Sequence, residues 1–274
     1  MQVKVIADSI SKEGKRITTF ELIYPRFIHA EMLRHRVFSR TVESSRAKPI
    51  KKNLDEVRIN PVLPRHLTLN EPGMVGTKEI TDFNKKEDIY DSLAMLAHMT
   101  VTAIEFLEQE YHLHKQVLNR YLEPFLNTKE VVTSTEWDNF FTLRLAPDAE
   151  PHIQELAALM KKGLEQSIPK LIKENGVHLP YVTKEEKSKY PINTLIKISS
   201  ARCARCSYKL YDGTTNIEKD LALYEKLRKG KHLSPMEHVA IADYKDNNGN
   251  WANPDYHGNF VGWCQHRKYV EVFK

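Results

Sequence analysis

The sequence predicts an α+β protein in which a mixed or antiparallel sheet packs against long helices. Three observations support this fold class. β-branched and aromatic residues dominate the start of the chain, two later segments carry apolar residues at helical spacing, and no repeat or linker interrupts the sequence. With 274 residues, 41% of them hydrophobic, the chain can form a sizeable core, and we predict a single domain over residues 1–274.

The first two elements are expected to be strands. Val3, Val5 and Ala7 alternate with polar residues, which is the pattern of a strand with one buried face. Residues 17–24 are mostly β-branched or aromatic, so the two segments can form an opening strand pair.

A short amphipathic helix is predicted next, over residues 25–33. A proline stands near its start, and Phe27, Ile28 and Met32 share one face. Residues 51–84 are rich in Pro, Asn and Lys and predict an extended loop. We interpret residues 70–74, Asn-Glu-Pro-Gly-Met, as a substrate-contacting part of this loop.

Two long helices follow. From Glu87 to Tyr111 an apolar residue recurs every three or four positions, which is typical of a helix with one buried stripe. Residues 148–151 cap a second helix, whose stripe runs from Ile153 to Ile168. We expect both stripes to be buried and the two helices to pack together.

Composition restricts the class of protein. The net charge of +5 is mild and mixed along the chain, which favours small acidic ligands over a nucleic-acid-binding face. No apolar run reaches the roughly 18 residues of a membrane span, and the first residues do not resemble a signal peptide. Cys203, Cys206 and Cys264 are too few for a disulfide framework, and no second pair completes a zinc site. We predict a cytoplasmic protein without a metal site.

The most informative segment spans residues 34–46, where arginines and hydroxyl residues are concentrated. Guanidinium groups donate paired hydrogen bonds to phosphate and carboxylate oxygens, and serine hydroxyls can complete the shell. The segment therefore predicts a binding site for a phosphorylated small molecule or a nucleic-acid backbone. A solvated basic surface is the alternative that its composition leaves open.

The order of residues in this segment resembles the signature of the flavin-dependent thymidylate synthases. Arg34-His35-Arg36 is followed after seven residues by Ser44 and then by Ser45-Arg46. In that family the Arg-His-Arg part contacts the flavin, and the serine–arginine end binds the deoxyuridylate phosphate. The preceding helix also resembles the family's motif helix, although Glu31 replaces the usual glutamine. The resemblance implies FAD binding by Arg34, His35 and Arg36, and dUMP binding by Glu31, Ser44, Ser45 and Arg46.

Two later arginines extend the resemblance. Arg120 with Pro124 matches a nucleotide-contacting element, and Asn139 with Arg144 matches a flavin-touching asparagine and an arginine at the uracil edge. Such an arginine stabilises negative charge on N3 and O4, so that C5 can attack a one-carbon electrophile without a covalent enzyme bond. From the residues alone, Arg144 lies between leucines and is expected to be partly buried, with an internal carboxylate or a ligand as its partner.

Residues 201–208 and 230–238 resemble two elements that precede Arg-His-Arg in the family. We infer a rearranged or circularly permuted chain in which residues 201–238 pack near the arginine motif and residues 199–274 complete the flavin site. The resemblance implies a catalytic His232 near flavin or folate, with Ser234 and Glu237 in the flavin site. Local sequence alone predicts that Ser234 to Glu237 form a helix capping box.

Some residues depart from the family pattern. Thr41-Val42 replaces an Asn-Glu pair, and Thr133 and Thr135 fall where an asparagine and an arginine contact flavin. We expect the flavin or the base to be held differently here. Residues 260–268 faintly repeat the motif helix, which we interpret as chance or a structural remnant.

The resemblance implies an FAD-dependent thymidylate synthase that converts dUMP to dTMP. Methylenetetrahydrofolate would donate the carbon and NADPH the reducing equivalents, at sites between the subunits of a homotetramer. Three alternatives stay open. These are a related flavin and folate enzyme that adds hydroxymethyl to a pyrimidine, a nucleic-acid-binding protein that uses the basic motif, and a cysteine-nucleophile synthase, whose cysteine loop no segment resembles.

Overall fold

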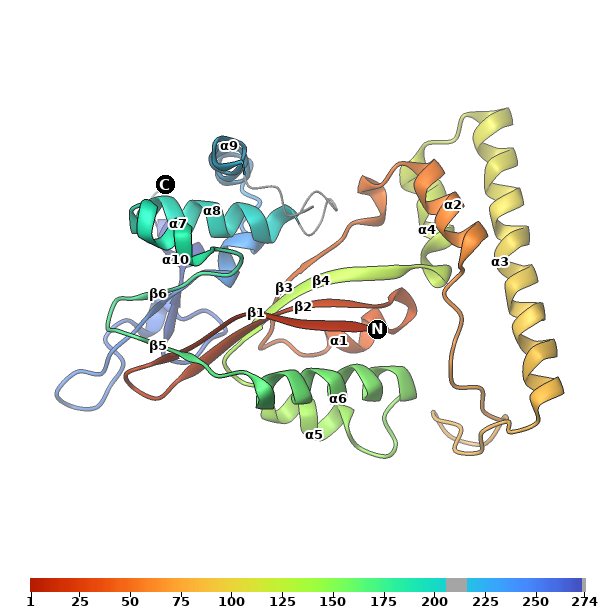
Figure 1. Cartoon of the computed structure of the whole chain (residues 1–274), viewed down its shortest axis with the longest axis horizontal. Coiled ribbons are helices and arrows are strands. Elements are labelled where there is room, and N and C mark those ends of the chain that lie inside the picture. Colours follow the sequence, from red (N-terminus) through yellow and green to blue (C-terminus); the bar gives the residue numbers. More distant parts are fainter. Residues whose placement is uncertain (206–215, 273–274) are drawn as a thin grey trace.

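The computed structural model describes residues 1–205 and 216–272, and it confirms the predicted α+β class. A five-stranded sheet in the order β3-β4-β2-β1-β5 forms its centre (Figure 1). The predicted opening pair is present as β1 (Gln2–Ser11) and β2 (Arg16–Pro25), which are antiparallel. β4 (Asn127–Ser134) adds to β2, and β3 (Ser39–Val42) adds to β4, both antiparallel, whereas β5 (Lys170–Ile172) runs parallel to β1.

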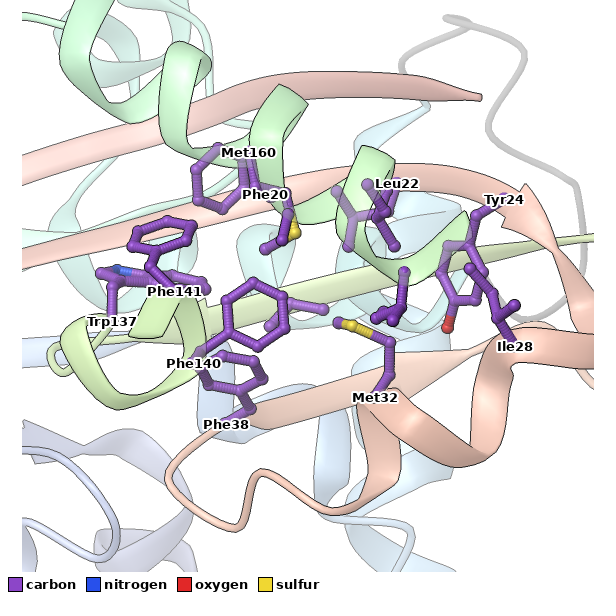
Figure 2. Packing of buried hydrophobic residues seen from close by; sticks show 14 residues of the cluster. Phe20, Leu22, Tyr24, Ile28, Met32, Phe38, Trp137, Phe140, Phe141 and Met160 are labelled. Atoms are coloured by element: carbon purple, nitrogen blue, oxygen red, sulfur yellow. The ribbon is translucent and has the colours of Figure 1, made fainter. Parts of the chain in front are cut away.

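One face of the sheet carries the main hydrophobic cluster. α1 (His29–Leu33), α5 (Asp138–Arg144) and α6 (Pro151–Gln166) supply its other side. Figure 2 shows Phe20, Phe38, Trp137 and Phe140 packed together, and the rings of Phe38 and Phe140 lie 5.2 Å apart. Because aromatic rings bury much area with defined geometry, this cluster fixes α5 against the segment that follows α1.

The C-terminal elements cover the opposite face (Figure 1). A second sheet in the order β6-β7-β8 lies there together with α-helices and short 3-10 helices. Their bounds are β6 (Val177–His178), α7 (Lys184–Lys189), α8 (Ile192–Arg205), α9 (Ile217–Lys229), η5 (Ser234–His238), β7 (Ala240–Ala242), η6 (Pro254–Tyr256), β8 (Trp263–Gln265) and α10 (His266–Val272).

A third group of helices stands at one end of the sheet and has its own core. It contains α2 (Ile50–Ile59), α3 (Phe83–Tyr111) and α4 (Lys115–Leu122), joined by the short helices η2 (Ser45–Ala47) and η3 (Glu123–Phe125) to β3 and β4; η1 (Arg26–Ile28) precedes α1. Among the described residues, no helix has the length and apolar character needed to span a bilayer.

Several local predictions were wrong. Residues 50–59 form α2 instead of an extended segment, because Leu54 and Val57 lie on one helical face and are buried against α3 and α4. The two long helices do not pack together, since α3 contacts α2 and α4 while α6 packs on the sheet and α5. The apolar stripes are also only partly buried: Leu96, Tyr111 and Ile168 are exposed.

Candidate active site

The Arg-His-Arg motif forms a turn at the end of α1, which we call the arginine turn (residues 34–38). Its backbone is closed by hydrogen bonds from His35 N to Met32 O (3.3 Å) and from Phe38 N to His35 O (3.2 Å). Arg34 and Arg36 are exposed, whereas the His35 side chain points inward and is 5% exposed. The turn therefore presents two guanidinium groups to solvent and one imidazole to the core.

His35 connects the turn to α5. Its ring packs edge-on against Phe140 at 4.9 Å, and its Nε2 accepts a hydrogen bond from Arg144 Nε (2.9 Å). Because a guanidinium can only donate, Nε2 carries a lone pair and the ring hydrogen sits on Nδ1. Burial, together with the charges of Arg144 and Arg40, lowers the pKa of His35 to about 4. His35 is thus a neutral acceptor that orients Arg144.

Arg144 has no carboxylate in an ion pair with it in the described part of the chain. Besides His35, its guanidinium donates from Nη2 to the carbonyl oxygen of Glu31 (3.2 Å). Burial and the nearby charge of Arg34 lower its pKa, and only the Glu31 carboxylate opposes this. A half-buried cation with neutral acceptors retains an unsatisfied preference for an anion.

These groups line one cavity of about 780 Å³. It brings together six residues that the sequence singled out, from segments more than 100 positions apart: Glu31, Arg34, His35, Arg36, Asn139 and Arg144. Met74, from the segment predicted to contact substrate, also lines it. Seven further lining residues were not predicted to belong to a site, because their contribution depends on how the loops fold: Val37, Val75, Leu143, Ala146, Asp148, Ala149 and Glu150.

Glu31 offers the cavity a buried acceptor. Its Oε2 is shielded from solvent and has no hydrogen-bond partner among the described residues. A buried carboxylate oxygen is costly to leave unpaired, so a ligand N–H or O–H group would lower the free energy of the site.

The residues predicted to bind phosphate lie outside this cavity. Ser44, Ser45 and Arg46 sit at η2, which packs against α4, the helix that carries Arg120. Asn119 Nδ2 fixes this contact by donating to Ser45 O (2.8 Å) and Lys48 O (3.0 Å). Arg46 and Arg120 are exposed. Within one chain, the predicted phosphate site and the arginine cavity are therefore separate.

The C-terminal site residues also lie elsewhere. His232 and Ser234 are exposed, Glu237 pairs with Arg267, and none of the three lines the cavity. The capping-box prediction was wrong, because η5 is a 3-10 helix preceded by Leu233 without a side-chain cap. Of residues 201–238, η5 packs on β3, the strand that follows the arginine turn, and it does so on the sheet face opposite the cavity.

Two buried histidines connect the C-terminal elements to the central sheet. His238 lies between Thr41 Oγ1 (2.9 Å) and Thr133 Oγ1 (2.8 Å), and His178 lies between Thr19 Oγ1 (2.8 Å) and Ser9 Oγ (2.9 Å). Burial lowers the pKa of both histidines to about 3, so they are neutral. Thr41 and Thr133, which depart from the family pattern, thus attach the C-terminal elements to the sheet and do not face the cavity.

Residues 201–203, the start of the C-terminal segment that resembles the family, lie in α8 and are buried. Arg202 is 1% exposed and is held by Glu186 Oε1 (2.6 Å), Asp220 Oδ2 (3.0 Å) and the carbonyl of Tyr181 (2.7 Å). Cys203 is buried. Cys206 and residues 207–208 of this segment lie outside the described residues.

A buried Asp243–His257–Cys264 cluster was not anticipated from the sequence. His257 Nδ1 accepts from Gly262 N (3.3 Å), so its hydrogen lies on Nε2 and is donated to Asp243 (2.8 Å). Burial raises the pKa of the Cys264 thiol to about 11. This cluster therefore joins loop segments by hydrogen bonds, and its thiol is unsuited to act as a nucleophile.

Solved structures with similar folds have low identity to this chain. ThyX from Helicobacter pylori, complexed with FAD and dUMP, is 17% identical over 54% of this chain and 67% of that chain, with a TM-score of 0.38. The UMP/dUMP methylase PolB from Streptomyces cacaoi, bound with 5-Br UMP, is 17% identical over 60% of this chain and 88% of that chain, with a TM-score of 0.48.

No curated protein sequence matches the chain significantly. The family described as "Thymidylate synthase complementing protein" matches residues 16–170, which include the arginine turn, Arg120, Asn139 and Arg144. Since this match covers more than half of the sequence and contains the motifs of residues 34–46, 120–124 and 139–144, the chain belongs to the thymidylate synthase complementing protein family, that of the flavin-dependent thymidylate synthases.

Proposed function

We propose that the protein is an FAD-dependent thymidylate synthase that converts dUMP to dTMP, with methylenetetrahydrofolate as carbon donor and NADPH as reductant. The observation that carries the proposal is the cavity that unites the arginine turn with Asn139 and Arg144. Family membership supports a flavin-dependent enzyme that acts on a pyrimidine nucleotide.

The side chains of this cavity fit an anionic cofactor with a flat ring. Arg34 and Arg36 are exposed forks suited to a pyrophosphate, and the Asn139 amide can both donate to and accept from a ring edge. Val37, Met74 and Leu143 give the cavity apolar surface. FAD, when bound, supplies the hydride-transfer chemistry of the reaction.

Arg144 is the group proposed to activate the uracil. Its Nε is occupied by neutral His35 and its Nη2 by the Glu31 carbonyl, which fixes the plane of the guanidinium. Nη1 makes no hydrogen bond within the described residues. A fixed cation aimed at N3 and O4 stabilises negative charge there, which raises electron density at C5.

The separation of the two predicted sites supports an active site shared between subunits. Ser44, Ser45, Arg46 and Arg120 would bind the dUMP phosphate beside the cavity of a neighbouring chain, in the homotetramer that the family resemblance implies. His232, Ser234 and Glu237 would reach the flavin of a neighbour in the same way, with His232 and Ser234 already at the surface.

Spectroscopy and product analysis test the chemistry. Purified protein titrated with FAD should show the perturbed absorption of a bound flavin, and dUMP should change that spectrum further. Anaerobic NADPH should bleach it, and addition of methylenetetrahydrofolate should yield dTMP by mass spectrometry. A hydroxymethyl product would support the related pyrimidine-modifying enzyme, whereas failure to bind flavin would reject both.

Mixing two inactive variants tests the sharing of the site. Arg144→Met removes the cavity arginine, and Arg46→Ala removes a phosphate ligand. If the two residues come from different chains, re-assembled mixtures should regain activity at about a quarter of the sites by random assortment. Mixtures that stay inactive would instead require both residues to serve from one chain.

A further inference from the structure

Arg40 anchors the arginine turn from β3. Its Nη1 donates to Met32 O (2.6 Å) and to His35 O (3.2 Å), the carbonyl groups on either side of Arg34. One guanidinium therefore bridges the end of α1 and the middle of the turn. The position from which Arg34 and Arg36 project depends on this bridge.

Arg40 also interacts electrostatically with the carboxylate of Glu130. Val42 pairs with Glu130 and Arg40 with Val132 in the β3–β4 register, so Arg40 and Glu130 occupy diagonal positions on one face of the sheet. Long side chains reach one another at such positions. Among residues 1–205 and 216–272 Arg40 forms no direct ion pair, and its charge lowers the pKa of Glu130.

Glu130 is completely buried. Its Oε2 accepts a hydrogen bond from the Tyr24 hydroxyl (2.6 Å), while Oε1 has no partner in the described part of the molecule. Burial outweighs the Tyr24 hydrogen bond and the charge of Arg40, and it raises the pKa of Glu130 to about 7. The charge of this side chain therefore changes near neutral pH.

Tyr24 connects Glu130 to α1. It lies beside Ile28 and Met32 in the hydrophobic cluster (Figure 2), and its hydroxyl is also 2.7 Å from His29 Nδ1. The hydroxyl has one hydrogen, which it gives to ionised Glu130 while His29 donates from Nδ1. When Glu130 gains a proton it can donate to Tyr24, whose hydrogen then turns to His29 Nδ1, and His29 accepts it as the tautomer with its hydrogen on Nε2.

Among the described residues, a few charged or titratable groups act on the hydrogen-bonded set of Glu130, Tyr24 and His29. They are Arg26 on η1, His29 on α1, Arg40 on β3 and Glu123 on η3. Burial, together with the charges of Arg26 and Arg40, lowers the pKa of His29 to about 4. His29 is thus neutral while Glu130 titrates.

We propose that Glu130 is a positioning residue for the arginine turn, holding Arg40 on the carbonyls of Met32 and His35 when ionised and loosening that anchor when protonated. Its effect on the cavity rests on the proposed function: FAD should bind more tightly when Glu130 is ionised. The neutral, isosteric variant Glu130→Gln imitates the protonated state at every pH.

Hydrogen exchange of the ligand-free protein tests the anchor without reference to activity. Peptides covering residues 32–38 should exchange equally in the wild type and Glu130→Gln at about pH 6, and on the order of tenfold faster in the variant at about pH 8. Comparison at the same pH cancels the intrinsic pH dependence of exchange. A constant ratio over this range would overturn the proposal.

Two further variants serve as controls for the exchange experiment. Glu186→Gln alters a buried carboxylate beside Arg202, and it should leave exchange at residues 32–38 unchanged. Tyr24→Phe keeps Glu130 but removes the hydrogen bond that favours its charged form, so the transition should move to higher pH. If it does not move, Glu130 is not the titrating group. Absence of FAD binding with a normal exchange transition would reject the proposed function and leave the anchor standing.

Discussion

Arg144 and Arg202 both lie near the ends of helices and both are withdrawn from solvent, but their partners differ. Arg202 is balanced by the carboxylates of Glu186 and Asp220. Within the described part of the chain, Arg144 donates to two neutral acceptors, the His35 ring and the Glu31 carbonyl, and it borders a cavity. A buried arginine with its own carboxylates contributes to folding, whereas one without them is available to an anionic ligand.

The two faces of the sheet repeat this difference. Towards α5, arginines and Glu31 line a cavity, and the buried Oε2 of Glu31 has no hydrogen-bond partner among the described residues. Towards η5, Thr41 and Thr133 form hydrogen bonds with His238. Both faces of the sheet carry polar side chains. Among the described residues, they differ in whether those side chains have hydrogen-bond partners.

The largest effect is expected for Arg202→Met. Glu186 would remain buried without its cation, while Asp220 would keep only Arg205, and an unpaired buried carboxylate typically costs about 3–5 kcal/mol. Urea denaturation should show this loss of unfolding free energy. In the double variant Arg202→Met with Glu186→Gln the loss should be less than the sum of the single losses. A single variant within about 1 kcal/mol of the wild type would contradict the structural role of Arg202.

Arg144→Met should lower activity far more than stability, in contrast to Arg202→Met. No carboxylate pair is broken, so stability should change little, while kcat/KM for dUMP should fall on the order of 10²–10³-fold through loss of charge stabilisation. Arg144→Lys is the matched control, since it keeps the charge but not the planar fork, and it should recover only part of the activity. Equal losses of stability and activity would show that Arg144 serves folding instead.

Acid should weaken the interface that His178 and His238 form. Burial lowers their pKa from 6.5 to about 3, so below pH 6.5 the unfolded chain binds protons that the folded chain does not. Stability should therefore fall as pH decreases from 6.5 towards 3, by up to about 1.4 kcal/mol per pH unit for each histidine.

His238→Gln tests this assignment. The amide can donate and accept as the imidazole does but cannot titrate, so the slope of unfolding free energy against pH should decrease in this range. His29, His35 and His266, whose pKa values burial lowers to about 4, maintain the rest of the slope. An unchanged slope would mean that His238 does not contribute to acid sensitivity.

Local patterns predicted much of the fold. The alternation of Val3, Val5 and Ala7 gave β1, and the stripe after Glu87 gave α3. The helical spacing of Ile50, Leu54 and Val57 was present but was obscured by the surrounding prolines and lysines. Packing could not be predicted in the same way, because apolar stripes do not specify their partners, and α3 and α6 belong to different cores.

The candidate site was only partly predictable for a similar reason. Motif order identified Arg34, Asn139 and Arg144, and the structure gathers them around one cavity. Their support, the Arg40 bridge and buried Glu130, depends on the β3–β4 register, which no short-range pattern encodes. The same holds for the acceptor role of His35, which requires Arg144 to arrive from 109 positions away.

Substitution of a third arginine, Arg228, is expected to have the smallest effect on stability. Arg228 donates to Glu225 (3.0 Å) on the surface of α9, with nearly half of its side chain exposed. Water screens such a pair and side-chain entropy opposes it, so Arg228→Ala should change the unfolding free energy by only about 0.5 kcal/mol and leave FAD binding unaltered. All three arginines carry the same charge, so differences in unfolding free energy among their variants reflect the groups around each guanidinium. If Arg228→Ala lost as much unfolding free energy as Arg202→Met, burial and pairing could not explain the effect at Arg202.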